Sequence, residues 1–326
     1  MKRSLQIISA IIVEISLIVF LVILGIKIVR FINERAKGIH YLTRINRLDI
    51  EFSSSSGGLK YFYEPKPNAK IALKADWLGH DVEYQVNADT LFEKRDYSNV
   101  KPEKTYRIVS IGDSFVFGAY VEQSENFSKL LENRLNSELN CKSELKFEVI
   151  NLGNGGYDIQ YAVNRFIKRG IKYNPDLVIW LINNWDFVKI NEEEIPLIRE
   201  YQKNGIKYNS SNGTWDDLIK VRKDKLSKYG IEYIIKHQSI SFQLLSEKYK
   251  KPILILTFPS LERLYYDAIK RNIENKSQFI IYSDLFDVNK DETYLFPDKH
   301  PNVKGHKKIA EDIFQYLKKN ILTECN

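Results

Sequence analysis

From residue 107 onward the chain alternates short, nearly all apolar runs with amphipathic segments, and this alternation limits the folds open to it. The runs, each expected to form a strand, lie at 107–111, 147–152, 177–182, 253–258 and 279–282. Strands that are apolar on both faces and separated by helices are typical of a parallel sheet covered on both sides. We therefore expect an α/β fold of three α/β/α layers around a mainly parallel, flavodoxin-like sheet of about five strands.

The segments between these runs have the periodicity and capping residues of helices. Ser124 can cap a helix whose leucines share one face, and Asp158 can cap the next helix. Further helices are expected in the mostly polar stretch 187–249, from residue 260 onward, and at 303–317. Because parallel sheets bind ligands at the carboxyl ends of their strands, residues that follow the strands are the first candidates for a site.

A different pattern marks the N-terminus. Residues 5–26 are predominantly apolar and carry a single charge, at Glu14. A run of 22 such residues is long enough to cross a bilayer as a helix. No signal-peptide cleavage site follows it, so we expect an uncleaved transmembrane anchor at residues 1–30. Residues 31–104 are expected to form a linker and a small β-rich region, and residues 105–326 the α/β domain.

The charges that flank the apolar run bear on which side of the membrane the domain occupies. Two basic residues precede the run and four follow it: Lys2 and Arg3, then Lys27, Arg30, Arg35 and Lys37. This count by itself favours a cytoplasmic domain. Large domains cross membranes largely regardless of such charges, and a domain tethered on the outer side can reach the polymers and lipids exposed there. We therefore expect a single-pass membrane protein with an extracytoplasmic domain.

Composition excludes several other classes. Lys and Arg outnumber Asp and Glu by 49 to 42, but the basic residues are spread along the chain, so nucleic acid is not an expected partner. The two cysteines, Cys141 and Cys325, do not have the spacing of a zinc site or of a disulfide framework. One disulfide between them and two free thiols both remain open.

Ser114 is the first candidate for chemistry. The segment Ile111–Phe115 (IGDSF) follows the first predicted strand, so the serine sits in a glycine-assisted turn at a strand end, next to a helix N-terminus. Backbone N–H groups at such a turn can stabilise an oxyanion, which suits a nucleophile. An ordinary strand-to-helix turn uses the same residue types, so this motif alone is weak.

A second group of polar residues comes late in the chain, in FPDKHPN (296–302). His300 can act as a base near neutral pH, and Asp298, two residues earlier, can orient its imidazole. A polar loop before a helix is the alternative. Metal binding by His300 and His306 is disfavoured, because they are six residues apart and lack the i, i+4 spacing of helix-borne ligands.

Together the two blocks resemble the SGNH (GDSL-type) hydrolase superfamily, over about residues 107–317. IGDSFVFG (111–118) is similar to its first block, with Phe115 where many members have leucine, and DKHPNVKGHKKIAEDI (298–313) is similar to its last. The resemblance implies a catalytic triad of Ser114, His300 and Asp298, with neither cofactor nor metal.

The resemblance also implies an oxyanion hole. Its donors would be the N–H of Ser114, the N–H of Gly156 in NLGNGGYD (151–158), and an asparagine side chain after the third strand. Here that stretch is INNWD (182–186), which departs from the family pattern, so either Asn184 or Asn183 could donate, with Asn184 slightly preferred. A dinucleotide-binding fingerprint around Gly153 and Gly155 is disfavoured, because its third glycine is replaced by aspartate.

These observations predict a serine ester hydrolase acting on an acyl ester of a glycan, a lipid or a small molecule. The alternatives are an O-acyltransferase on envelope polysaccharide and a non-catalytic, membrane-tethered binding module on the same fold. Trp185, beside the asparagine pair, could wall an acyl pocket, whereas Trp77 has no functional neighbours in the sequence.

Overall fold

The structure is a computed structural model that describes residues 39–42, 50–52, 59–141, 144–206, 214–283, 285 and 292–325. The transmembrane anchor expected at residues 1–30 lies outside these residues and stays a prediction. Within the described part of the chain, no helix combines the length and the apolar character needed to cross a membrane.

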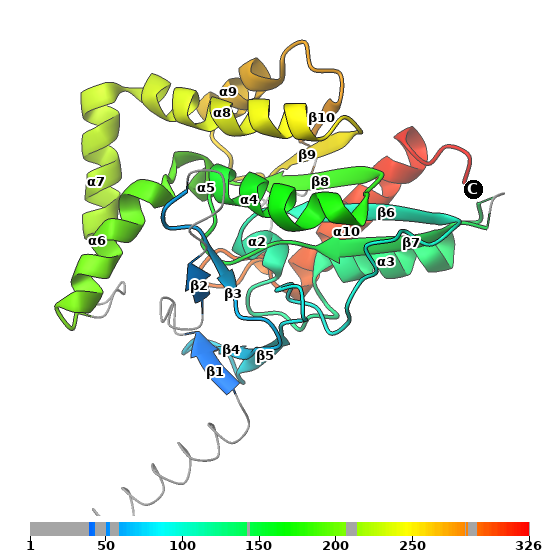
Figure 1. The fold of residues 1–326 in the computed structure, drawn as a ribbon, viewed down its shortest axis with the longest axis horizontal. Coiled ribbons are helices and arrows are strands. Elements are labelled where there is room, and N and C mark those ends of the chain that lie inside the picture. Colours follow the sequence, from blue (N-terminus) through cyan, green and yellow to red (C-terminus); the bar gives the residue numbers. More distant parts are fainter. Residues whose placement is uncertain are drawn as a thin grey trace, which may run out of the picture.

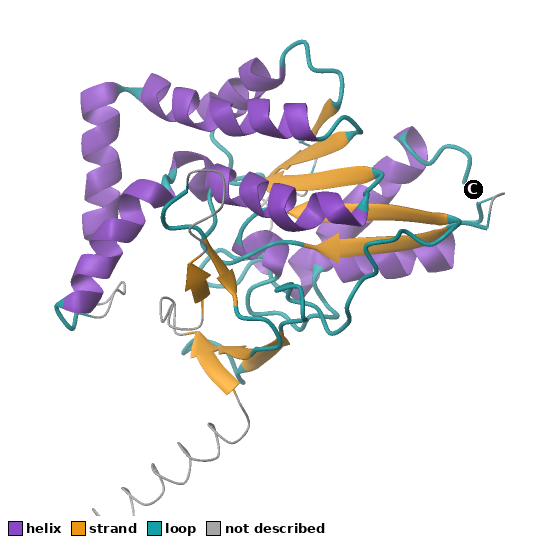
Figure 2. Ribbon diagram, in the orientation of Figure 1, coloured by secondary structure: helices purple, strands orange, loops and turns teal. Residues whose placement is uncertain are grey.

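A five-stranded parallel sheet forms the centre of the molecule (Figures 1 and 2). Its strands are β6 (Thr105–Ile111), β7 (Lys146–Asn151), β8 (Leu177–Ile182), β9 (Ile253–Thr257) and β10 (Phe279–Tyr282). They are ordered β10-β9-β8-β6-β7, and every neighbouring pair is parallel. The expected flavodoxin-like sheet is therefore confirmed, and its strand order reverses between β6 and β8, where such sheets bind ligands.

Helices cover both faces of this sheet. One face carries α3 (Phe127–Glu138) and α10 (Val303–Asn320), and the other carries α4 (Ile159–Arg165), α8 (Ile231–Lys248) and α9 (Arg263–Ile273). Side chains of β8 alternate between the two cores, with Trp180 packed under α8 and Leu181 facing α3 and α10. This confirms the three layers, and it explains why β8 is apolar at every position and the other strands nearly so.

The helix boundaries follow their caps. Asp158 caps α4 as expected, accepting from the backbone N–H of Tyr161 at 2.8 Å. The prediction for Ser124 was wrong, because residues 122–125 form a turn and Asn126 caps α3 by accepting from Lys129 N–H. The helix expected from residue 260 begins at Arg263.

The polar stretch between β8 and β9 is helical, as expected. It forms α5 (Asn184–Val188), α6 (Asn191–Lys203) and α7 (Thr214–Tyr229) before it enters α8. Figure 1 shows α6 and α7 extending beyond the edge of the layered core, while the short α5 lies close to the sheet.

The region before β6 contains short strands. These are β1 (Ile39–Leu42), β2 (Ile50–Phe52), β3 (Tyr63–Pro65), β4 (Lys70–Leu73) and β5 (Val82–Gln85), arranged as a β1-β4-β5 sheet and a β2-β3 pair. The boundary placed between residues 104 and 105 stays a prediction.

This region is fastened to the α/β layers by a buried charge cluster. Glu64 pairs with Arg165 at 2.9 Å, with Arg169 at 2.8 Å and with Lys168 at 2.7 Å. Burial alone would raise the pKa of Glu64, but these three cations lower it to about 2.

A hydrogen bond also links the β-rich region to the turn after β6. The Tyr84 hydroxyl donates to the carbonyl of Gly118, 3.0 Å away and four residues after the candidate nucleophile. The β-rich region is therefore held beside the candidate site.

Cys141 and Cys325, which the sequence left undecided, are joined in a disulfide. Both residues are buried in the core under α3 and α10, at 8% and 4% exposure. The bridge ties the C-terminal end of the chain to the segment between α3 and β7, across 184 residues of sequence.

Candidate active site

The turn after β6 presents Ser114 at the start of the short helix α2 (Ser114–Phe117). Gly112 has a φ of 150°, and a Cβ there would lie 2.9 Å from the carbonyl oxygen of Leu181, so the turn requires glycine. Asp113 caps the helix, accepting from Phe115 N–H at 2.9 Å. The carboxyl end of β6 and the Asp113 cap together fix Ser114 at the point where the strand order reverses.

The structure brings Ser114 and His300 together although 186 residues separate them. The Nε2 atom of His300 lies 2.8 Å from Ser114 Oγ, and its Nδ1 atom lies 3.0 Å from Asp298 Oδ2. The Nδ1 contact is not aligned as a full hydrogen bond, so it acts here as an electrostatic contact. The Asp298 side chain is 8% exposed and that of His300 is 19% exposed, so the imidazole is partly accessible while its carboxylate partner is buried.

Backbone contacts hold the loop that carries these two groups. Phe296 N–H donates to the carbonyl of His300 at 2.8 Å, and Lys299 adopts a left-handed conformation with φ of 70°. Asn302 then caps α10 through Gly305 N–H. The loop is thus anchored on both sides of His300.

His306 has a different role. It is fully buried in α10, and its Nδ1 accepts from the backbone N–H of Phe127 at 3.2 Å. Burial, with a smaller contribution from the charge of His300, lowers its pKa to about 3. A neutral histidine locked in the core joins α10 to the start of α3, and it does not contact Ser114.

The two asparagines after β8 are separated by the start of α5. Asn183 is 1% exposed, caps the helix, and donates from Nδ2 to Asp113 Oδ2 at 3.1 Å. Asn184 faces outward, where its side chain contacts Glu262. The geometry therefore favours Asn183 as the candidate oxyanion donor, against the slight sequence preference for Asn184.

Gly156 lies in the loop after β7 with φ of 76°. Its carbonyl accepts from Asn191 Nδ2 at 3.0 Å and from the ammonium of Lys189, which fixes the peptide plane. The same loop packs tightly on α2, because a Cβ at Gly153 would lie 2.2 Å from Phe117 N. The structure thus places the Gly156 loop against the helix that begins at Ser114.

Aromatic rings surround His300, and sequence reasoning missed them. The imidazole lies 5.1 Å from the ring of Phe115 and 5.5 Å from that of Tyr120. Trp77, which had no functional neighbours in the sequence, packs 4.9 Å from Tyr120 and 5.0 Å from Phe296. No local signal could have linked residue 77 to the site, because the contact exists only through the packing of the β-rich region.

Trp185 stays close to the site but is 47% exposed. Its backbone N–H donates to Asn183 Oδ1 at 2.8 Å, and the guanidinium of Arg222 lies 5.1 Å from its ring. That guanidinium is paired with Glu194 at 2.6 Å. The indole is therefore placed beside the candidate donor as an exposed ring, and its role as a pocket wall stays a prediction.

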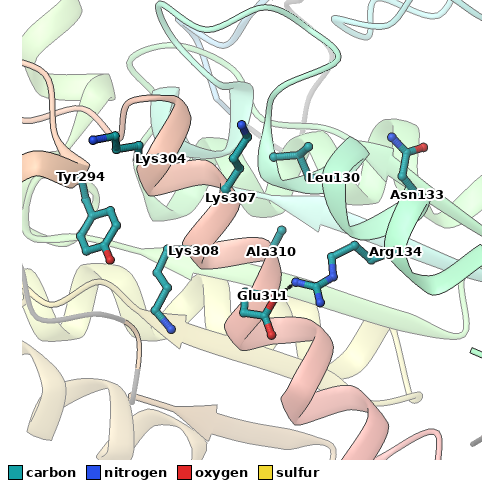
Figure 3. A pocket seen from close by; sticks show the side chains of 9 residues that line it. All are labelled: Leu130, Asn133, Arg134, Tyr294, Lys304, Lys307, Lys308, Ala310 and Glu311. Atoms are coloured by element: carbon teal, nitrogen blue, oxygen red, sulfur yellow. Dashed lines mark ion pairs between the residues drawn. The ribbon is translucent and has the colours of Figure 1, made fainter. Parts of the chain in front are cut away.

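A surface cavity lies elsewhere, between α3 and α10 (Figure 3). Four of its nine lining residues are basic, and the lining consists of Leu130, Asn133, Arg134, Tyr294, Lys304, Lys307, Lys308, Ala310 and Glu311. Arg134 is paired with Glu311, and Lys308 with Asp312. None of the predicted site residues lines this cavity.

Across the described ranges, no three or more His, Cys, Asp or Glu side chains are grouped so that they could hold a metal ion.

The sequence matches no family model and no curated protein. Among solved structures it is similar to the esterase EstA of Pseudoalteromonas sp. inhibited by monoethylphosphonate, at 15% identity over 65% of this chain and 97% of that one, with a TM-score of 0.43. It is similar to TesA at 13% identity over 65% and 98% of the two chains, with a TM-score of 0.42. A catalytic mutant of Axe2, an acetylxylan esterase from Geobacillus stearothermophilus, matches at 15% identity over 67% and 95%, with a TM-score of 0.42.

Proposed function

We propose that this chain is a serine ester hydrolase of the SGNH type, with Ser114 as nucleophile, His300 as general base and Asp298 as the group that orients the imidazole. The observation that carries the proposal is the contact chain from Ser114 Oγ to His300 Nε2 at 2.8 Å and from His300 Nδ1 to Asp298 Oδ2 at 3.0 Å. Such a chain at the switch point of a parallel sheet has the geometry of an activated hydroxyl.

The reaction follows from these contacts. Ser114 Oγ attacks the ester carbonyl while His300 Nε2 takes the hydroxyl proton, and the imidazolium is stabilised by Asp298. His300 returns the proton to the leaving alkoxide, which departs as the alcohol and leaves an acyl-serine. Water, deprotonated by the same imidazole, then releases the carboxylic acid and restores the serine.

The negative charge that develops on the carbonyl oxygen needs donors. The proposal assigns this role to the backbone N–H groups of Ser114 and Gly156 and to Nδ2 of Asn183. Asn183 is suited to it because it is buried and its amide is held by Asp113 on one side and by its cap on the other. Loss of one such donor typically costs about 10²–10³ in kcat.

The direct test is covalent labelling with a fluorophosphonate, followed by hydrolysis of p-nitrophenyl acetate. Wild-type protein should label at Ser114 and hydrolyse the ester, and Ser114→Ala should do neither, with kcat lower by roughly 10⁴ or more. The matched control is Ser239→Ala on α8, whose hydroxyl donates to the carbonyl of Lys236 in the preceding turn. Labelling at another serine, or full activity in Ser114→Ala, would refute the assignment.

The proposed substrate is an acyl ester of a glycan, a lipid or a small molecule. An acyl-serine can also pass its acyl group to an alcohol, so adding a sugar acceptor to the assay distinguishes O-acyl transfer from hydrolysis. A protein that neither labels nor turns over would instead be a binding module on this fold.

The proposal also includes the location of the domain. We place it outside the cytoplasmic membrane, held there by the anchor expected at residues 1–30. The Cys141–Cys325 disulfide supports this, because disulfides form and persist in oxidising compartments and are rare in the cytosol.

A further inference from the structure

Asp186 is a buried carboxyl group that the proposed reaction does not use. It lies in the first turn of α5 and is 3% exposed. Its Oδ2 accepts from the backbone N–H of Asn183 at 3.0 Å, which completes a capping box with the Asn183 side chain. Asp186 therefore holds the residue that carries the candidate oxyanion donor.

The second oxygen of this carboxyl group lacks a donor. Asp186 Oδ1 is buried, and within the described residues no N–H or O–H group donates to it. An ionised carboxylate oxygen left buried without a donor costs free energy that a protonated carboxyl avoids. The nearest acidic neighbour acting on this group is Asp113, itself 6% exposed, and Asn183 contacts both carboxyl groups, Asp186 through its backbone N–H and Asp113 through Nδ2.

Asp113 is the partner better suited to carry the negative charge. It accepts from Phe115 N–H at 2.9 Å and from Asn183 Nδ2 at 3.1 Å, while the single proton of the nearby Ser114 hydroxyl is directed to His300 in the proposed reaction. Asp186 has one backbone donor. Two carboxyl groups in contact in a buried place cannot both ionise cheaply, so the proton belongs on the one with fewer donors.

The remaining charged groups do not cancel this effect. Lys189, at the end of α5, is the cation that acts on Asp186, and its ammonium is bonded to the carbonyl of Gly156. The loop after β7 contributes Asp158, whose carboxylate is occupied by two backbone donors, and α8 contributes the neutral Gln238. Burial first, and Asp113 second, raise the pKa of Asp186 well above its ordinary value.

We propose that Asp186 is a positioning residue that stays protonated at neutral pH and donates a hydrogen bond from Oδ1 to the Asp113 carboxylate. Asn183 is then held from both sides, by the backbone contact to Asp186 and by the side-chain contact to Asp113. The shared proton also keeps a single negative charge, rather than two, behind the site where the oxyanion develops. This role rests on the proposed function, whereas the protonation does not.

Protonation is tested without any assay of activity. Infrared spectra of the full-length protein should contain the C=O stretch of a buried carboxylic acid at neutral pH that Asp186→Asn removes. Asp216→Asn, a change at an exposed position on α7, is the matched control and should leave the band in place. Glu93 and Asp158 are also buried carboxyl groups whose pKa is raised, so the criterion is the wild-type minus Asp186→Asn difference spectrum. A difference spectrum without such a band at neutral pH would overturn the protonation.

The positioning role is tested by kinetics on the same variants. Asparagine can donate to Asp113 and accept from Asn183 N–H as a protonated aspartate does, so Asp186→Asn should keep kcat within about threefold. Asp186→Ala should lower kcat by about 10- to 100-fold with KM nearly unchanged, because an interaction made only in the transition state is weakened. Circular dichroism shows whether each variant folds.

Four outcomes are distinguishable. Rescue by asparagine but not by alanine supports the positioning role, and equal losses in both folded variants overturn it. Activity of Asp186→Asn should also extend to higher pH than that of wild type, because the variant has no proton to lose. If wild-type protein lacks esterase activity altogether, the proposed function fails, while the infrared result still decides the state of Asp186.

Discussion

At the scale of single residues, two histidines six positions apart differ completely in environment. His300 lies in a loop with its ring partly accessible and its Nε2 at Ser114, whereas His306 is enclosed in α10. A base must be reachable by substrate and able to take up a proton near neutral pH. His306 is buried and its pKa is lowered to about 3, so it meets neither condition. His300→Gln should therefore abolish ester hydrolysis, and His306→Gln should retain most of it in whatever fraction folds.

The burial of His306 also predicts how stability depends on pH. The unfolded residue takes up a proton below about pH 6.5, but the folded one does not until about pH 3. Unfolding therefore takes up a proton between about pH 6.5 and pH 3. The contribution of His306 to the free energy of unfolding is constant above about pH 6.5, and it falls by about 1.4 kcal/mol per pH unit as the pH drops toward 3. Denaturant unfolding at pH 7 and pH 5 should show a smaller loss in His306→Gln than in wild type. Equal losses would mean that His306 is already charged in the folded state.

At the scale of elements, the loop after β7 and the helix α2 depend on each other's close approach. A Cβ at Gly153 would lie 2.2 Å from the backbone nitrogen of Phe117, whereas a Cβ at Gly155 would meet nothing within 4 Å. Gly153→Ala should therefore lower the free energy of unfolding by about 1–3 kcal/mol, the usual cost of overpacking. It should also lower esterase activity, because the same loop carries Gly156. Gly155→Ala is the matched control, and a thermal melt that ranked the two variants equally would contradict the packing.

At the scale of the whole molecule, the disulfide and the proposed location make a joint prediction. Full-length protein from its native membrane, denatured without reductant, should not react with a maleimide, and after reduction it should react at both Cys141 and Cys325. Protease added to intact cells should digest the domain. Free thiols together with protection from protease would place the domain in the cytoplasm, and the basic residues after the apolar run would then be the better guide.

Much of the fold could be predicted from the sequence because its signals are local. Each strand of the sheet is an apolar run whose neighbours in the chain decide its type, and the Asp158 cap needs only the residues that follow it. The two motifs around Ser114 and His300 were likewise recognisable as short segments. Parallel strands end at the same edge of a sheet, so the parallel arrangement alone led us to expect that these two motifs lie close together.

What only the tertiary structure decided involves contacts between distant parts of the chain, or the exact residue at which an element begins. Asn183 and Asn184 are chemically identical, and the start of α5 turns one toward Asp113 and the other toward Glu262. Trp77 reaches the rings beside His300 because the β-rich region packs there, and Cys141 meets Cys325 because α3 and α10 lie side by side. Local sequence determines which element a residue enters, but the partners of a buried side chain depend on how the elements pack.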